Sequence, residues 1–248
     1  MILRRITANF RRQDWMAVVI ELVIVILGVF IGLQVNNWNE ARNDRALERQ
    51  YIQRLHDDFA RSIKRAEKNI ARTEVQLVLE GEMVGRLREC HLDDRQRTDF
   101  AKGVFLVGRF QGPTLVRGTI DELQSTGRIG IIRNLKLRQA LSDLVEAQMG
   151  DSEVLGYIVA RATPQVAYID TRTVLLQPPG GFTAAPSSDQ VLLDFPTLCH
   201  DPAYIGAVST LQELTHVVTF QNQRALAADR AMLKMLDGEL GNKTEPTP

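Results

Sequence analysis

The sequence predicts an all-α protein in which a single N-terminal transmembrane helix continues into a long-helix bundle or helical hairpin domain. The first observation is an apolar run of twenty residues, from Met16 to Val35, whose only polar side chains are Glu21 and Gln34. A run of this length lets one helix cross the hydrocarbon core of a bilayer. The second is that apolar residues recur every three or four positions over most of the remaining chain, which is the spacing of one helix face.

The composition excludes several classes of protein. The 248 residues include 30 basic and 30 acidic side chains. Because a nucleic-acid surface needs a basic excess, we expect no nucleic-acid partner. Two cysteines exclude a disulfide-rich scaffold and leave at most one bridge.

The apolar run has the features of a membrane anchor. Trp15 and Trp38 bracket it, as indole rings do at the two interfaces of a bilayer. A cleaved signal peptide is the alternative, but the run is too long and no small-x-small cleavage site follows it. We therefore expect a short basic tail at 1–14 and an uncleaved transmembrane signal anchor at 15–38, with the lipid bilayer as a partner.

Arginines lie on both sides of this anchor, in nearly equal number. The four in the tail are offset by Asp14 alone, whereas those after the anchor are interleaved with Glu40, Asp44 and Glu48. The positive-inside rule then favours a cytoplasmic N-terminus and an extracytoplasmic helical domain at 39–240.

Three residues of the anchor share one helix face. At 100° per residue, Gly28 and Gly32 fall within about 20° of Glu21. The two glycines have the small-xxx-small spacing that lets helix backbones approach closely, and a carboxyl in that groove can hydrogen-bond across a homodimer. We therefore predict a homodimer through this face. The alternative is that Glu21 reaches the interface or pairs with an arginine.

After the anchor, helix-forming residues run almost unbroken over 40–89, and we expect this helix to continue the membrane span. Ile63, Ile70, Leu77 and Val84 repeat every seven residues, which predicts coiled-coil-like packing.

The rest of the domain is predicted as shorter elements separated by glycine, proline and polar residues. We expect, in order, a polar connection at 91–99, a short helix through Phe110, a helix at 119–125 with Gly127 as C-cap, a helix from the N-cap Asn134 to Leu176 with one break near Gly150, an irregular stretch at 177–194, a final helix from Pro202 to Leu240, and a disordered tail at 241–248. Segments 104–107 and 191–195 are short enough to be strands instead.

The two cysteines lie at the ends of long helices: Cys90 follows the first and Cys199 precedes the last. If those helices pack antiparallel, both cysteines reach the membrane-distal tip, and a disulfide there closes a loop of roughly a hundred residues. Such a bridge needs an oxidising compartment, which agrees with an extracytoplasmic domain. The alternatives are a zinc site completed by His91 and His200, and two unlinked thiols.

Motifs of catalytic sites do not occur. The chain has no G-x-x-x-x-G-K-[ST] loop, no G-x-S-x-G elbow and no H-E-x-x-H motif. His56 lies beside Asp57 and Asp58, but such a cluster is more often a solvated helix face. His216 is expected to be a core or semi-buried residue. We therefore predict a protein that is not an enzyme and needs no cofactor or metal.

Two segments resemble an uncharacterised family of bacterial single-pass membrane proteins, catalogued as a domain of unknown function. The first, from Glu21 to Asn39, has an acidic residue entering a glycine-containing span and ends in an LQxxNWN motif formed by Leu33, Gln34, Asn37, Trp38 and Asn39. The second, residues 119–140, is similar to a Glu-Leu-x-x-[Ser/Thr]-Gly-[Lys/Arg] element followed by an Arg-Asn turn. The resemblance covers about a sixth of the chain. It implies a bacterial inner-membrane protein with a helical domain, here periplasmic, and it implies no reaction.

Together these observations predict a membrane-anchored helical envelope protein, a non-enzymatic interaction or assembly module that dimerises and whose protein partner is unknown. The alternative is a ligand-sensing extracytoplasmic bundle that signals through a partner protein. An unrecognised enzyme is a third hypothesis, which a polar pocket with perturbed ionisable groups would support.

Overall fold

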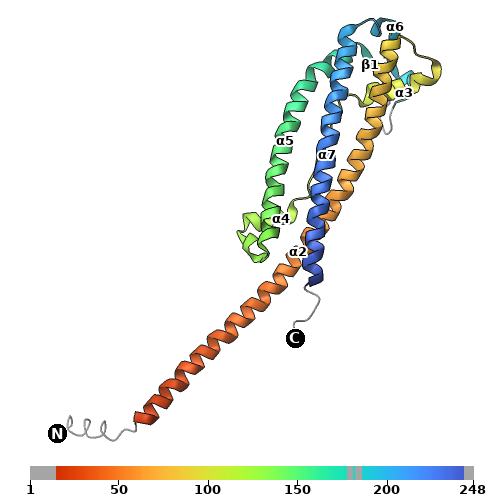
Figure 1. Cartoon of the computed structure of the whole chain (residues 1–248). Helices are drawn as coiled ribbons and strands as arrows, with labels where there is room; N and C mark the ends of the chain where they lie inside the picture. The colour runs from red at the N-terminus through yellow and green to blue at the C-terminus, as the bar shows by residue number, and fades with distance from the viewer. Residues whose placement is uncertain (1–14, 178–180, 182–185, 243–248) are drawn as a thin grey trace, which may run out of the picture. The chain divides into compact units, whose positions relative to one another are not determined.

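The computed structural model describes residues 15–177, 181 and 186–242. The chain divides into two units, residues 1–51 and 52–248. The elements follow one another as α2 (Trp15–Glu89), α3 (Asp94–Leu106), α4 (Gly118–Ser125), η1 (Arg128–Ile131), α5 (Leu135–Asp170), β1 (Thr173–Leu175), η2 (Ser188–Gln190), β2 (Val191–Leu193), α6 (Phe195–Leu198) and α7 (Pro202–Asn242). Helices make up most of the chain in Figure 1, so the predicted all-α fold is confirmed.

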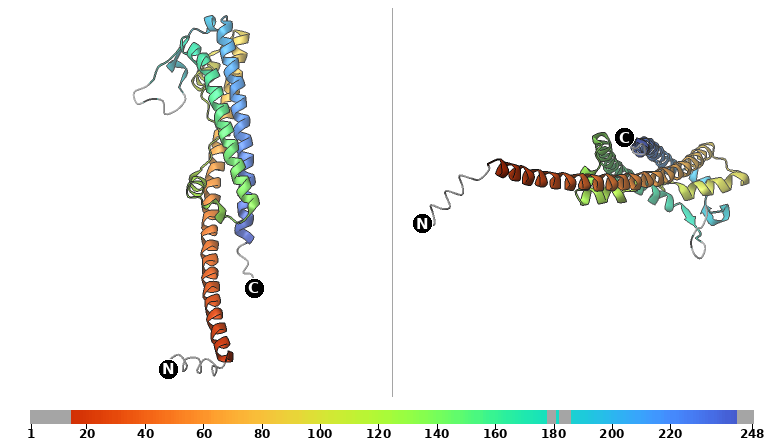
Figure 2. Two further views of the ribbon diagram at one scale, coloured as in Figure 1. Left: turned by 90° about the vertical axis from the view of Figure 1, so that its left-hand side faces the viewer. Right: turned by 90° about the horizontal axis from the view of Figure 1, so that it is seen from below.

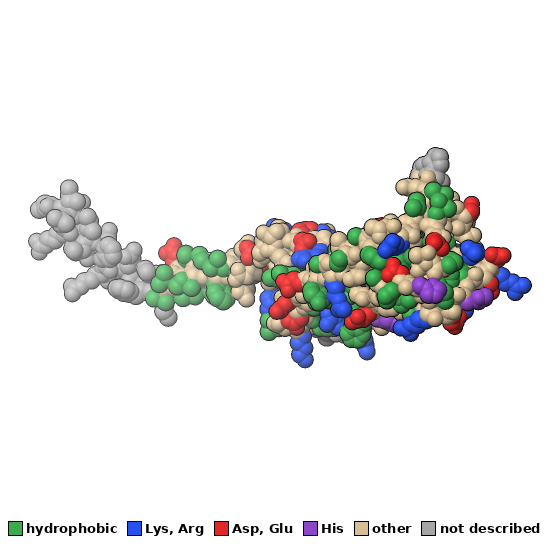
Figure 3. Space-filling view, turned by 90° about the horizontal axis from the view of Figure 1, so that it is seen from above, with side chains coloured by type: hydrophobic (Ala, Val, Ile, Leu, Met, Phe, Trp, Pro, Cys, Tyr) green, Lys and Arg blue, Asp and Glu red, His purple; other side chains and the backbone are tan. Residues whose placement is uncertain are grey.

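Helix α2 is a single helix of 75 residues, as the absence of breakers predicts. Between Val19 and Val35 its large apolar side chains are 46–63% exposed. Figure 3 shows this stretch beside the grey N-terminal residues with a mostly apolar visible face. Among the described residues it is the one helix that is long and apolar enough to cross a membrane. Side chains of this kind are normally buried in a soluble protein, which agrees with an anchor.

Three long helices run side by side in the second unit: the part of α2 beyond residue 51, α5 and α7 (Figures 1 and 2). On α7, Thr215 lies 3.3 Å from the Nε2 atom of Gln76 on α2, and Arg230 pairs with Glu67. Because higher numbers on α7 meet lower numbers on α2, the two helices are antiparallel, as expected. Two ion pairs show the same relation between α5 and α7. The second unit is therefore a bundle rather than a hairpin.

One end of this bundle is closed by α3, α6 and a two-stranded sheet. Strands β1 and β2 pair antiparallel, with Thr173 opposite Leu193. Phe100 of α3 and Phe195 of α6 pack edge to face with ring centroids 5.4 Å apart. Both belong to an apolar core that also contains Tyr204 of α7, which is fully buried.

Two predicted helix starts are confirmed, whereas the C-cap of α4 is Thr126 and not the predicted Gly127. Asn134 accepts hydrogen bonds from the backbone N–H groups of Lys136 and Leu137 at 2.9 and 3.2 Å, so it is the N-cap of α5. Gly127 directly follows the C-cap of α4 and has φ +68°, a conformation that favours glycine. Helix α7 begins at Pro202.

The predicted polar connection at 91–99 is wrong from Asp94 onward, where the chain is helical. Helix α3 begins at Asp94 because Asp93 and Gln96 form a capping box, in which each side chain binds the backbone of the other. Residues 104–106 belong to the same helix, so the strand considered at 104–107 is absent from this described segment.

The predicted course of α5 is also partly wrong. The helix passes Gly150 without a break, since a glycine inside a helix costs only about 1 kcal/mol relative to alanine. It ends at Asp170, and residues 173–175 form β1, whose partner is the strand at 191–193. Helix α7 extends to Asn242 rather than Leu240. The predicted disordered tail at 241–248 is therefore wrong for its first two residues, and its remainder and the predicted tail at 1–14 lie outside the described residues.

The row of buried residues along α2, here called the seam, lies one position before the predicted heptad residues. Ile63, Ile70 and Leu77 are only half-buried. The seam consists of Leu55, Phe59, Ser62, Ala66, Asn69, Thr73, Gln76, Glu80, Met83 and Leu87. Because its middle is polar, the apolar pattern in the sequence favours the neighbouring positions instead.

Candidate functional site

A cavity of about 570 Å³ lies between α5, α7, α2 and the loop at 113–115, all within the second unit. This volume is in the range of sites that bind small molecules. The lining consists of Ala66, Pro113, Thr114, Leu115, Leu144, Ala147, Gln148, Gly150, Asp151, Val154, Arg224, Ala225, Ala228 and Asp229. Most of these side chains are small or apolar, and three carry an ionisable charge.

Small residues on two facing helices create this space. Ala147 and Gly150 lie three positions apart on α5, and Ala225 and Ala228 have the same spacing on α7. A Cβ atom added at Gly150 would meet no other atom within 4 Å. Ala147 and Gly150 are exposed and Ala225 and Ala228 are half-buried, so the four residues line an opening between the helices that larger side chains would fill. The residue types therefore specify the cavity.

The loop wall of the cavity is held from three sides. The Nδ2 atom of Asn222 on α7 donates to the carbonyl oxygen of Gln111 at 2.9 Å, and Arg72 on α2 donates to the Gln111 side chain at 3.1 Å. At the next position, a Cβ on Gly112 would lie 2.8 Å from a methyl carbon of Leu155, so a larger residue would displace the Leu155 side chain of α5. These contacts position the residues that follow as one wall.

An ion pair crosses from α5 to α7 at the cavity. The Asp151 carboxylate binds the guanidinium of Arg224, and the two side chains are 8% and 58% exposed. Gln221 also donates to Asp151 at 3.5 Å. The buried carboxylate is thus neutralised by a cation that itself reaches solvent, which reduces the cost of burying the pair.

Asp229 is the second carboxyl of the lining and has no such partner. It is buried, and within the described residues no hydrogen bond or ion pair reaches its carboxyl. Desolvation by burial raises the pKa of Asp229 to about 7. Both protonation states are therefore populated at neutral pH, and a bound group that neutralises the carboxylate would shift this balance.

Another buried carboxyl, Glu80, lies in the polar seam between α2 and α7. Its Oε1 atom accepts hydrogen bonds from Gln76 at 2.8 Å and from Thr215 at 3.1 Å. Its Oε2 atom is buried and has no hydrogen-bond partner among the described residues. Desolvation raises the pKa of Glu80 to about 7, although the two hydrogen bonds act in the opposite direction.

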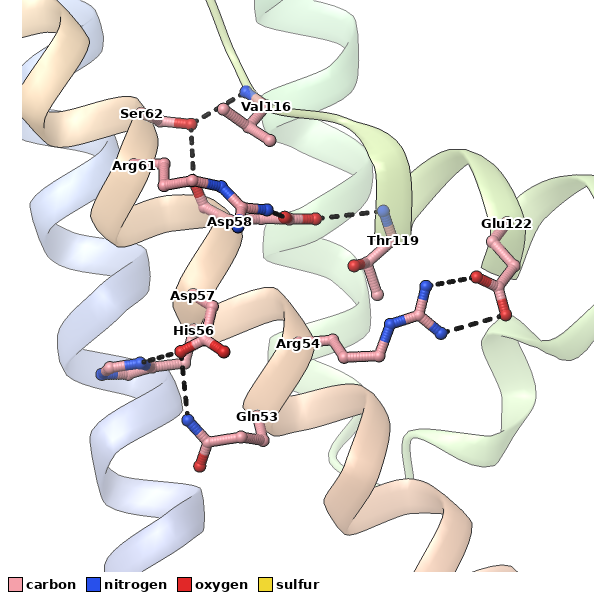
Figure 4. Close-up of polar contacts among 10 residues, drawn as sticks. All are labelled: Gln53, Arg54, His56, Asp57, Asp58, Arg61, Ser62, Val116, Thr119 and Glu122. Atoms are coloured by element: carbon pink, nitrogen blue, oxygen red, sulfur yellow. Dashed lines mark hydrogen bonds and ion pairs between the residues drawn. The ribbon is translucent and has the colours of Figure 1, made fainter.

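The start of α4 is held by side chains of α2, as Figure 4 shows. Asp58 accepts from the Thr119 backbone N–H at 3.0 Å, and Ser62 accepts from the Val116 N–H at 2.8 Å. The first N–H groups of a helix have no partner within it. Because the N-cap residue Arg117 makes no capping hydrogen bond through its side chain, Asp58 supplies this function from a neighbouring helix, while Ser62 holds the backbone just before α4.

His56 links two helices at the surface of the bundle. Its ring nitrogens lie 3.4 Å from Asp57 on α2 and 3.2 Å from Asp237 on α7. Asp58 binds α4 instead of the imidazole, so the predicted cluster is not assembled as one site. His216 is exposed on α7, and the expectation of a core or semi-buried position is therefore wrong.

The structure brings Cys90 and Cys199 together, as predicted. Their Cα atoms are 5.1 Å apart and their sulfurs lie at disulfide-bonding distance, across a sequence separation of 109. His200 joins this group, with its Nδ1 atom 3.4 Å from Cys199 and 3.8 Å from Cys90. His91, the fourth residue of the alternative zinc site, is outside the group of possible metal ligands found among the described residues. A disulfide is therefore the better interpretation.

The predicted dimer face of the anchor is exposed within the first unit. Glu21, Gly28 and Gly32 all face away from other described atoms, and a Cβ added at either glycine would meet none within 4 Å. Trp38 is 62% exposed. The side chain of Trp15 lies outside the described part of the chain. Both the dimer and the interface anchors stay predictions.

Comparison of the chain with protein-family models, with curated proteins and with solved structures found no match. The family resemblance of the LQxxNWN motif and of residues 119–140 therefore stays a prediction. Three residues of the second segment have a structural role in this fold. Glu122 forms an ion pair with Arg54 of α2 (Figure 4), and Leu123 and Ile132 are fully buried.

The charged residues of the cavity and the seam were missed by motif searches. A signal for them is present in the sequence, because each lies in phase with buried apolar residues. Asp151 precedes the buried Ile158 by seven positions, Asp229 precedes Leu236 by seven, and Glu80 belongs to the seam already described. A charged residue in the apolar phase of a helix indicates a buried polar group, and such groups are frequent at functional sites.

Proposed function

We propose that this chain is a membrane-anchored helical protein that binds a small ligand in the cavity between α5, α7 and α2. The observation that supports the proposal is the cavity, which has about 570 Å³, a mostly apolar lining and a buried carboxyl without a partner. Thr114, Gly150 and Val154 of the lining are exposed, so the cavity is open to solvent and a ligand can enter it directly. The cavity therefore favours the ligand-sensing bundle over the assembly module that the sequence alone ranks first.

We propose that the chain binds this ligand without catalysing a reaction. The described lining contains no cysteine, histidine, lysine or serine, and its one hydroxyl belongs to the exposed Thr114. The one cationic side chain, Arg224, is paired with Asp151. We therefore propose a binding protein rather than an enzyme.

Helix α2 connects the cavity to the anchor. Ala66 lines the cavity, and the same helix contains the apolar segment that is long enough to cross a membrane. We propose that a ligand alters the packing of α7 on α2 and that a partner protein reads the resulting movement of α2.

A thermal-shift screen of small apolar and amphipathic molecules on the full chain in lipid nanodiscs tests ligand binding. We expect some of them to raise Tm, because a ligand at 100 times its Kd stabilises the native state by about 2.7 kcal/mol. The key variant is Gly150→Leu, which places a side chain in the cavity. The matched control is Gly156→Leu on the same helix, where an added Cβ also meets no atom within 4 Å but which does not line the cavity.

The screen has clear outcomes. Stabilisation that persists in Gly156→Leu and is lost in Gly150→Leu supports the proposal, and Ala228→Leu should repeat the loss from the α7 side. A screen in which no molecule stabilises the wild type, or in which both glycine variants respond like the wild type, contradicts it.

We further propose that the anchor lies in a bacterial inner membrane, with the N-terminus cytoplasmic and residues 39–240 in the periplasm. The proximity of Cys90 and Cys199 supports this location, because disulfides persist in oxidising compartments. Intact mass after alkylation, with and without prior reduction, tests it on membrane-extracted protein. Two thiols that react only after reduction, in a species of monomer mass, agree with the proposal. Thiols that react in both samples oppose it.

A second proposed function is dimerisation through the anchor, favoured by the shared face of Glu21, Gly28 and Gly32. Crosslinking in membranes should yield dimers for the wild type and mostly monomers for the double variant Gly28→Ile, Gly32→Ile. The control is Val19→Ile with Val23→Ile, also four positions apart but on the opposite helix face. A wild type that crosslinks only as a monomer would remove the dimer from the account.

A further inference from the structure

The charges that line the cavity do not balance. Asp151 and Arg224 neutralise each other, which leaves Asp229 as the remaining charged group of the lining. The next cation along α7, Arg230, pairs with Glu67 of α2. When Asp229 is ionised, an apolar cavity therefore holds one net negative charge.

A buried carboxylate is stable only with a partner that neutralises it or donates hydrogen bonds to it. Within the described residues the protein supplies neither to Asp229. The Asp229 oxygens are not among the fully buried atoms without a partner, so they face the open space of the cavity, where water or the head group of a bound molecule can donate to them.

We propose that the cavity binds a primary amine, with its ammonium group at Asp229 and a compact apolar body against Leu115, Leu144 and Val154. This inference rests on the function proposed above and names the chemical class of its ligand. A primary ammonium has three N–H donors, and its hydrogen bonds to a carboxylate are of the strong, charge-assisted kind.

Other head groups match the lining less well. A carboxylate or phosphate would face Asp229 while the only cation of the lining, Arg224, is paired with Asp151. A hydroxyl donates one hydrogen bond but brings no charge. A quaternary ammonium is typically held by aromatic rings, and the described lining has none.

The cavity volume limits the size of the apolar body. At about 30 Å³ for each water-sized group in a liquid, the cavity accommodates roughly 15 to 20 non-hydrogen atoms. A naphthalene ring with a one-carbon arm has roughly 12 and leaves room for the cavity walls to adjust.

The test is calorimetric titration of the full chain in nanodiscs of zwitterionic lipid, corrected with nanodiscs that lack protein. The probes are 1-naphthylmethylamine, its N,N,N-trimethyl derivative, 1-naphthalenemethanol and 1-naphthylacetate, which share one apolar body. The key variant is Asp229→Asn. The control is Asp237→Asn, the same substitution on the same helix at an exposed residue outside the cavity.

We expect the amine to bind about 10- to 100-fold more tightly than the alcohol, the trimethyl derivative and the acid, as charged hydrogen bonds predict. Asp229→Asn should abolish this preference without weakening the alcohol, and Asp237→Asn should leave it unchanged. Equal binding of the amine and the alcohol would overturn the amine inference and leave the cavity as a binding site. If no probe binds, the proposed function fails as well.

Discussion

Thr215 on α7 donates a hydrogen bond of 3.1 Å to one oxygen of Glu80 on α2, while the other oxygen of that carboxyl is buried and has no partner in the described part of the chain. The contact between these two helices is therefore polar and incompletely satisfied at its centre. Asp229 of α7 is a second buried carboxyl, and it too has a raised pKa. The stability of the bundle should accordingly depend on the ionisation of both groups.

Replacing Glu80 by Gln should stabilise the fold at alkaline pH and have little effect at acidic pH. The pKa of Glu80 rises from 4.5 to about 7 on folding, so the native state binds this proton more tightly than the unfolded state. Stability then decreases as pH rises from about 4.5 to about 7. Above pH 7 the charged carboxyl costs on the order of 3 kcal/mol, which Gln avoids. Thermal unfolding at pH 5 and pH 8.5 measures the difference.

The control for this prediction is Glu74→Gln, an exposed position on the same helix. It should alter stability by no more than about 0.5 kcal/mol at either pH. An effect of Glu80→Gln that is the same at pH 5 and pH 8.5 would show that ionisation of this carboxyl does not limit stability.

Asp58→Ala should destabilise the bundle by about 1 to 3 kcal/mol, because it leaves the Thr119 N–H without its hydrogen-bond acceptor. Asp57→Ala, at the adjacent and more exposed position, is the matched control and should cost less than about 0.5 kcal/mol. Denaturant unfolding measures both, and faster amide exchange at Thr119 in Asp58→Ala would locate the effect in α4. Equal costs for the two variants would be incompatible with capping by Asp58.

Reduction of the Cys90–Cys199 bridge should lower stability by about 4 kcal/mol, since the bridge closes a long loop in the unfolded chain. Unfolding of the purified protein with and without reductant measures the effect. The double variant Cys90→Ser, Cys199→Ser should resemble the reduced wild type and be insensitive to reductant. A wild type whose stability is unchanged by reductant would indicate that the thiols are unlinked.

The elements that were predicted correctly from the sequence are those that depend on interactions within one segment or between two segments. The unbroken α2 follows from helix-forming residues, and the start of α5 from the N-cap Asn134. The meeting of Cys90 with Cys199 follows from antiparallel packing of the first and last long helices. Each of these needs only one segment or one pair of segments.

The elements that were not predicted depend on packing or pairing between segments that are far apart in the sequence. The strand at 173–175 exists because a distant strand at 191–193 pairs with it. The polar stretch from Ser62 to Glu80 is buried because α7 and the loop after α3 cover it, so the apolar periodicity favoured the wrong face. The cavity is a further case, since its four small residues come from two helices that are not adjacent in sequence.

Proton release on ligand binding tests the account most directly. The pKa of Asp229 is about 7, so at pH 6 about nine-tenths of this carboxyl is protonated. An ammonium group binds the ionised form, and binding of 1-naphthylmethylamine at pH 6 should therefore release about 0.9 proton, decreasing to almost none at pH 8.5. Calorimetry in buffers of different ionisation enthalpy measures this number. The release should disappear in Asp229→Asn, and binding of the amine with no pH-dependent proton release would show that its ammonium group is not held by Asp229.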